Sequence, residues 1–146
     1  MNFKTSRRVE FRDTDTAGIV HFSCFYVYME QTEHAFLREI GHPLFGEVDG
    51  KRCSWPRVAA SCNFRSAIQF EQIIDIELSV TRHGTKSITY SFKFSREGTP
   101  VADGTLTAVY CEIEHGKLPK SIKIPTEFAA AVKPYQVEEA EQASNG

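Results

Sequence analysis

The chain has 146 residues, 41% of them apolar and 25% charged, which is ordinary composition for one globular domain with its own core. Its formal net charge of −2, with the basic residues scattered, argues against a nucleic-acid-binding surface. The four cysteines and five histidines form no pattern of a zinc site. The N-terminus has no apolar core of a signal peptide, and no apolar run approaches the length of about 18 residues that a membrane span needs. We therefore expect a cytoplasmic protein with reduced thiols, no metal, and no nucleic-acid or membrane partner.

Apolar periodicity divides the first half of the chain into a strand and a long helix. Residues 3–11 alternate between apolar and polar side chains, which predicts a strand. Residues 23–40 carry apolar side chains at three- and four-residue steps, which predicts a helix with Ser23 as its N-cap. Gly41 and Pro43 are stop signals for that helix. Residues 41–54 are expected to form a loop.

The second half reads as four strands joined by short turns. Strands are predicted at 55–64, 74–81, 88–95 and 102–110, with turns at 83–85 and 98–100. The last of these strands has small residues on one face, which would let a helix lie close. Pro125 can begin a short helix that runs to about residue 132. We expect an α+β domain over residues 1–134, with an antiparallel sheet around one long central helix, and a disordered acidic tail over 135–146. The pattern alone leaves other α+β arrangements open.

Residues 13–22, with the sequence Asp-Thr-Asp-Thr-Ala-Gly-Ile-Val-His-Phe, connect the first strand to the long helix. A loop of this kind can place a carboxylate beside the free N–H groups at the start of a helix. That pairing suits attack on a carbonyl carbon and stabilisation of the oxyanion that forms.

The loop resembles the 4-hydroxybenzoyl-CoA thioesterase family of hotdog-fold enzymes, whose signature is Asp-x-Asp-x-x-Gly-x-Val before the central helix. Asp13, Asp15, Gly18 and Val20 fill its four fixed positions. The resemblance covers roughly residues 3–130 and implies a hotdog fold. It also implies an acyl-CoA thioesterase that produces a carboxylic acid and free coenzyme A, with no metal or redox cofactor.

The same resemblance assigns roles in catalysis. It implies that Asp15 is the catalytic carboxylate, as nucleophile or as general base, and that the backbone N–H of Phe22 holds the thioester oxygen. His21 is a further candidate for catalysis, as a general base. The alternative is that it only packs against its neighbours. The family also carries the pantetheine of coenzyme A along a dimer interface, so a homodimer or homotetramer is expected.

Substrate-binding candidates follow from the chemistry of coenzyme A. Several phosphate charges need cations, for which Lys86 and Arg57 are our choices, with Arg82 and Arg65 also considered. Aromatic side chains would line the acyl pocket. The full set of predicted substrate-binding residues is Lys86, Gly18, Phe25, Trp55 and Arg57.

Other polar side chains near the loop receive supporting roles. Asp13 is expected to brace the loop by accepting hydrogen bonds, since two close carboxylates would raise each other's pKa. Glu30 and Glu33 on the helix are expected to be structural, although another hotdog branch uses a helix glutamate for catalysis. Cys24 is expected to pack. Two alternatives to a thioesterase stay open: a non-catalytic acyl-CoA-binding protein and an acyl-CoA hydratase or dehydratase.

Overall fold

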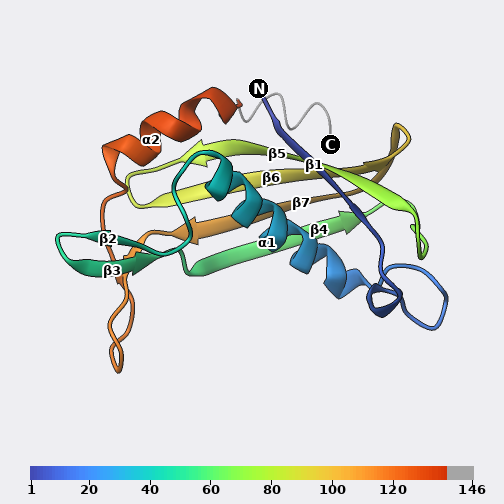
Figure 1. The fold of residues 1–146 in the computed structure, drawn as a ribbon, viewed down its shortest axis with the longest axis horizontal. Coiled ribbons are helices and arrows are strands. Elements are labelled where there is room, and N and C mark those ends of the chain that lie inside the picture. Colours follow the sequence, from blue (N-terminus) through green and yellow to red (C-terminus); the bar gives the residue numbers. More distant parts are fainter. Residues whose placement is uncertain (138–146) are drawn as a thin grey trace.

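A computed structural model describes residues 1–137 of the chain. Five strands form the main sheet: β1 (Phe3–Arg8), β4 (Arg57–Phe64), β5 (Ile73–His83), β6 (Ser87–Arg96) and β7 (Thr99–Val109). Their order is β1-β5-β6-β7-β4, and all neighbours are antiparallel. The long helix α1 (Phe22–Glu39) crosses one face of this sheet, as Figure 1 shows. The predicted α+β class and central helix are confirmed.

The helix lies on the sheet because both surfaces are apolar at the contact. Phe25, Tyr28, Met29, Phe36 and Leu37 of α1 are buried, at the spacing expected of one helix face. The sheet side is supplied by alternate residues of each strand, such as the buried Ile74, Ile76, Leu78 and Val80 of β5.

A glycine lets α1 lie close to the main sheet, as the small residues of the fourth strand predicted in the second half of the chain suggested. A Cβ atom built on Gly104 of β7 would lie 2.6 Å from Sδ of Met29 and 2.9 Å from the carbonyl oxygen of Ser61. A larger residue at this position would require the Met29 side chain of α1 and the β4 backbone at Ser61 to move.

A second sheet corrects the prediction for residues 41–54. These residues are not only a loop, because they contain β2 (Gly46–Val48) and β3 (Lys51–Ser54), which join β8 (Cys111–Glu112) and β9 (Lys120–Ser121) in the order β2-β3-β8-β9. Asp49 and Gly50 connect β2 to β3 with φ values of +53° and +77°. An Asp-Gly pair with two positive φ angles is the favoured turn of a tight hairpin, so the signal was present in the sequence.

The ends of several elements differ from the expected ones. The first strand stops at Arg8, and a 3₁₀ turn, η1 (Phe11–Asp13), replaces its predicted end. The short helix α2 (Thr126–Val132) begins after Pro125, which is the N-cap.

The described chain continues in contact with the domain beyond residue 134. Tyr135, in the 3₁₀ turn η2 (Lys133–Tyr135), packs edge-on against Phe36, and the N–H of Val137 donates to the carbonyl of Val80 at 2.8 Å. The rest of the predicted tail, 138–146, lies outside the described residues. Within residues 1–137, no helix is long and apolar enough to cross a membrane.

Candidate active site

The loop between η1 and α1 is closed by its own backbone. Thr14 and Val20 form an isolated antiparallel bridge, and the N–H of Asp15 donates to the carbonyl of Ile19 at 2.9 Å. The chain reverses at Gly18, whose φ of +80° is costly for any residue with a Cβ atom. The glycine of the signature therefore sets the turn that carries Asp15, and it supports the site through the backbone.

Asp15 is exposed and lines an apolar cleft of about 340 Å³. One carboxylate oxygen, Oδ1, accepts the N–H of Ala17 at 2.8 Å, which orients the group and leaves its other oxygen free of protein donors among residues 1–137. Most of the cleft is apolar or aromatic. The residues that line it are Asp15, Ile19, Val20, Phe22, Phe25, Phe64, Arg65, Ser66, Ala67 and Ile68.

Asp13 points the other way, into the protein. It is buried, and its Oδ2 accepts both the backbone N–H of Glu10 at 2.9 Å and the hydroxyl of Tyr28 at 2.8 Å. The guanidinium of Arg7 lies 4.4 Å from the centre of the Tyr28 ring. Burial and the nearby Asp13 carboxylate both raise the pKa of Tyr28, which keeps its hydroxyl protonated as a donor. The geometry is that of a brace between the loop and the second turn of α1.

Tyr28→Phe should therefore destabilise the protein. The change leaves buried Asp13 with one donor fewer, which costs about 1–3 kcal/mol of unfolding free energy. Urea denaturation measures this loss. Tyr135→Phe is the matched control, because the Tyr135 hydroxyl makes no hydrogen bond within the described residues, and an equal loss in both variants would contradict the brace.

The first turn of α1 supplies N–H groups at the edge of the cleft. Phe22 is the first residue of the helix, so its amide has no partner within the helix, and its side chain lines the same cleft as Asp15. His21, and not Ser23, is the N-cap: its Nδ1 accepts the N–H of Ser23 at 3.3 Å and contacts Oγ of Ser23 at 2.8 Å. His21 thus caps the helix beside the cleft and is not one of its lining residues.

The remaining predicted substrate-binding residues lie elsewhere. Trp55 is buried against Tyr110 and Phe128 and lines a separate cavity of about 570 Å³ beside α2. Lys86 is exposed in the β5–β6 turn, where its carbonyl accepts the N–H of Tyr110 at 2.8 Å. Within one chain, the structure brings Asp15, Phe22 and Phe25 together, with Gly18 in the turn, and does not bring Trp55 or Lys86 to them.

Comparison with known proteins places this geometry in a family. Residues 9–132 match the thioesterase-like superfamily. The chain belongs to that superfamily. It is 24% identical over 129 residues to a 4-hydroxybenzoyl-CoA thioesterase from Pseudomonas sp. (strain CBS-3), covering 84% of this chain and 91% of the relative.

Solved structures of thioesterases share the fold. A gentisyl-coenzyme A thioesterase superposes with a TM-score of 0.78 at 29% identity, covering 89% of this chain and 99% of that one. A 1,4-dihydroxy-2-naphthoyl-CoA thioesterase from Synechocystis gives a TM-score of 0.78 at 19% identity, covering 90% and 96%, and this likeness is one of fold. The central helix on an antiparallel sheet is consistent with the predicted hotdog fold, and the chain is a thioester hydrolase by family.

Arg57 of this thioesterase-like chain is held in an ion-pair cluster that the sequence did not reveal. Its guanidinium contacts the carboxylate of buried Glu33 and the carbonyl of Trp55, and Nη2 lies 4.0 Å from Oε2 of Glu30. Burial raises the pKa of Glu33 to about 7, and the Arg57 charge offsets part of that rise. Arg57 is thus a structural partner of two glutamates in the single chain.

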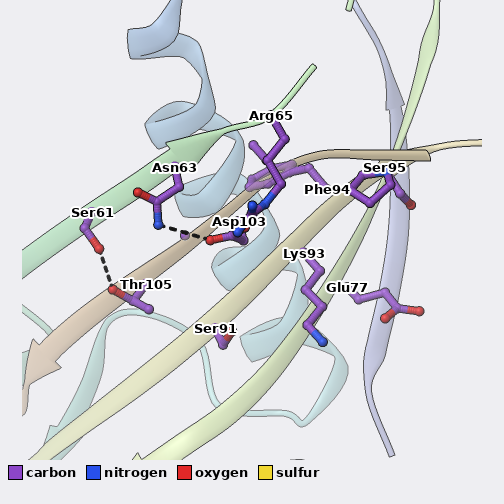
Figure 2. Close-up of a pocket in the computed structure, with 13 residues that line it drawn as sticks. Ser61, Asn63, Arg65, Glu77, Ser91, Lys93, Phe94, Ser95, Asp103 and Thr105 are labelled. Carbon is purple, nitrogen blue, oxygen red and sulfur yellow. Dashed lines mark hydrogen bonds and ion pairs between the residues drawn. The ribbon is translucent and has the colours of Figure 1, made fainter. Parts of the chain in front are cut away.

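Arg65 is the cation at the Asp15 cleft, and it also borders a polar groove on the sheet face opposite α1. Asp103 accepts hydrogen bonds from Arg65 at 2.6 Å and from Asn63 at 3.2 Å, and the hydroxyls of Ser61 and Thr105 are 2.8 Å apart. Figure 2 shows these side chains directed toward one another. The groove, of about 560 Å³, also contains Lys93 and Glu77. Its two cations are balanced by two carboxylates, so it is not a built polyphosphate site.

Among residues 1–137, no three His, Cys, Asp or Glu side chains cluster as a metal site would require.

Proposed function

We propose that this protein hydrolyses an acyl- or aroyl-coenzyme A thioester to the free acid and coenzyme A. The observation that carries the proposal is the exposed Asp15 carboxylate over an apolar cleft that it shares with Phe22, the first residue of α1. The names of the relatives, which are thioesterases acting on coenzyme A esters of aromatic acids, support the same substrate class.

Asp15 would act at the thioester carbonyl in one of two ways. As a nucleophile, its carboxylate oxygen bonds to the carbonyl carbon, the carbon–sulfur bond breaks, and a mixed anhydride forms that water then hydrolyses. As a general base, Asp15 takes a proton from the water that attacks the carbonyl. On either route negative charge develops on the carbonyl oxygen, and the N–H of Phe22 at the positive end of α1 would stabilise it.

The cleft favours an apolar or aromatic acyl group. Phe22, Phe25 and Phe64 supply three aromatic rings to it, and Arg65 is the cation at its border. We also propose that the protein acts as a homo-oligomer built on a dimer, because no strand within residues 1–137 pairs with the outer edges of β1 and β4.

A thiol-release screen tests the function. The purified protein is incubated with benzoyl-, hydroxybenzoyl-, hydroxynaphthoyl- and fatty acyl-coenzyme A, and free coenzyme A is followed with a thiol reagent. We expect release from at least one thioester. Saturable binding without release would favour the non-catalytic alternative, and consumption of an enoyl-coenzyme A without thiol release would favour a hydratase.

A further inference from the structure

The first turn of α1 leaves one of its N–H groups without an acceptor. The opening N–H groups of a helix have no partner inside the helix, so they need acceptors elsewhere. The N–H of Ser23 donates to Nδ1 of His21 at 3.3 Å, and the N–H of Cys24 donates to the His21 carbonyl at 2.9 Å. The N–H of Phe22 has no acceptor within residues 1–137. His21 therefore engages the two neighbouring donors and leaves the Phe22 N–H free.

His21 is also fixed to the loop that carries Asp15. Its own N–H donates to the carbonyl of Asp13 at 2.8 Å. The Asp13 side chain is buried and accepts the Tyr28 hydroxyl at 2.8 Å, so this carbonyl belongs to the braced part of the loop. One residue thus joins the loop to the start of the helix, and its conformation sets where Phe22 lies relative to Asp15.

The His21 side chain has three properties that would serve the site, and its contacts separate them. Its Nδ1 is an acceptor for the Ser23 N–H and lies 2.8 Å from Oγ of Ser23. Its ring centroid lies 4.7 Å from that of Phe22. Its imidazole is a possible base, but the side chain is exposed and does not line the Asp15 cleft. Of the three properties, the acceptor is the one that acts on the backbone of the first turn.

A cap of this kind determines how well the first turn is ordered. Alanine at an N-cap weakens the start of a helix, whereas asparagine is among the preferred caps. Order matters here because an oxyanion is stabilised only by donors at a fixed position, and loss of one such donor lowers kcat by about 10²- to 10³-fold. A first turn that shifts by about 1 Å would lose part of that stabilisation. Binding of the rest of the substrate would be unchanged, so the loss appears in kcat and not in KM.

We propose that His21 is a positioning residue of the Asp15 site. By capping α1 through Nδ1, it holds the Phe22 N–H at the place where the thioester carbonyl oxygen gains negative charge. The inference rests on the proposed thioesterase function and gives His21 no step in which a bond forms or a proton moves. It replaces the general-base role that the sequence left open for this histidine.

Three substitutions separate the three properties of His21. His21→Asn keeps an acceptor at the N-cap and has neither ring nor base. His21→Phe keeps a ring beside Phe22 without an acceptor, and His21→Ala keeps none of the three. On the best substrate of the thiol-release screen, we expect kcat of His21→Phe and His21→Ala to fall about 10-fold, with KM within about 2-fold of wild type. His21→Asn should keep kcat within about 2-fold of wild type.

The other roles of His21 predict other orders of activity. A general base predicts that His21→Asn is as slow as His21→Ala, and ring packing predicts that only His21→Phe stays active. Either result would overturn the proposal, as would wild-type kcat in all three variants or a rise in KM at unchanged kcat. The comparison of His21→Asn with His21→Phe decides the matter, even where His21→Ala does not fold.

Ala130→Gly controls for a general loss of helix stability. Ala130 is exposed in α2, and glycine inside a helix costs about as much stability as a lost cap. This variant should lower the melting temperature about as much as His21→Phe does and leave kcat unchanged. An equal fall of kcat in both would trace the effect to stability and overturn the positioning role.

The carbonyl band of a bound ketone reports the position of the Phe22 N–H without turnover. The probe is the analogue of the best substrate in which a CH₂ group replaces the thioester sulfur. In infrared difference spectra, we expect the carbonyl band to move to lower wavenumber on binding to wild type and to His21→Asn, and to move less in His21→Phe. Equal shifts in the three proteins would overturn the proposal. Thiol release by wild type tests the proposed function separately, because it does not depend on any His21 variant.

Discussion

Asp15→Asn is expected to lower kcat by about 10²- to 10⁴-fold, and by more if Asp15 is the nucleophile. The amide has the size of the carboxylate and can still accept the N–H of Ala17 through its oxygen. It is neither a useful nucleophile nor a base. Because Asp15 is exposed and makes this one side-chain hydrogen bond, we expect the unfolding free energy to stay within about 0.5 kcal/mol of wild type.

Asp13→Asn is the matched control, two residues away in the same loop. Asp13 is buried and bonded to Glu10 and Tyr28, so its replacement should lower the melting temperature more than Asp15→Asn does and lower kcat less. Both variants are checked by circular dichroism and assayed on the best substrate from the thiol-release screen. Near-wild-type kcat in folded Asp15→Asn would remove Asp15 from the mechanism. Two stable and inactive variants would mean that the aspartates act as a pair.

The sequence predicted the elements whose signals are local. Strands β5, β6 and β7 alternate cleanly and are joined by short turns, and α1 has one continuous apolar face, so their order and packing followed from periodicity. Strands β2 and β3 were missed because they are short and polar, and Asp49-Gly50 between them was the one available signal. The first strand was drawn too long because Val9 and Phe11 continue the alternation into the 3₁₀ turn.

The site divides in the same way. The loop could be predicted from its signature, because a short segment can specify its own turn. In the structure the glycine of the signature has a positive φ, Asp13 is buried and Asp15 is exposed. Arg57 could not be understood from sequence, since its partner Glu33 is 24 residues away and the two meet only when β4 lies under α1. Tyr28 was visible only as an apolar position of the helix, and its hydroxyl bond to Asp13 spans 15 residues.

Arg57→Ala is expected to destabilise the protein by about 3–5 kcal/mol at pH 8. The Glu33 side chain is 1% exposed, and its carboxylate contacts the Arg57 guanidinium directly. Removing the arginine leaves a buried negative charge with its hydration lost. Its remaining basic neighbour, His34 at 3.8 Å, is neutral at pH 8, because burial lowers the pKa of that histidine. The double variant Arg57→Met with Glu33→Leu removes both charges together and should regain most of the loss. Urea denaturation of the four proteins gives the coupling between the two positions.

The loss of stability in Arg57→Ala should depend on pH, and the protonation of Glu33 determines the direction of this dependence. Burial raises its pKa from an ordinary value near 4.5 to about 7 in the folded protein. Between these values the folded chain binds the proton more tightly than the unfolded chain, so unfolding free energy falls as pH rises from about 4.5 through 7. Without Arg57 the folded-state pKa rises further, because the guanidinium was lowering it. The deficit of Arg57→Ala is therefore smaller at pH 5, where Glu33 can be protonated, than at pH 8.

Arg65→Ala is the control that separates the effect of exposing the buried Glu33 charge from the effect of removing an arginine in general. The Arg65–Asp103 pair has a direct contact of 2.6 Å, but its side chains are 44% and 32% exposed, so water screens both charges. Its removal should cost less than about 1 kcal/mol, equally at pH 5 and pH 8. Equal deficits for the two arginine variants, or a deficit in Arg57→Ala that does not change between pH 5 and pH 8, would mean that Glu33 is hydrated in solution and that the α1–β4 contact is open to water.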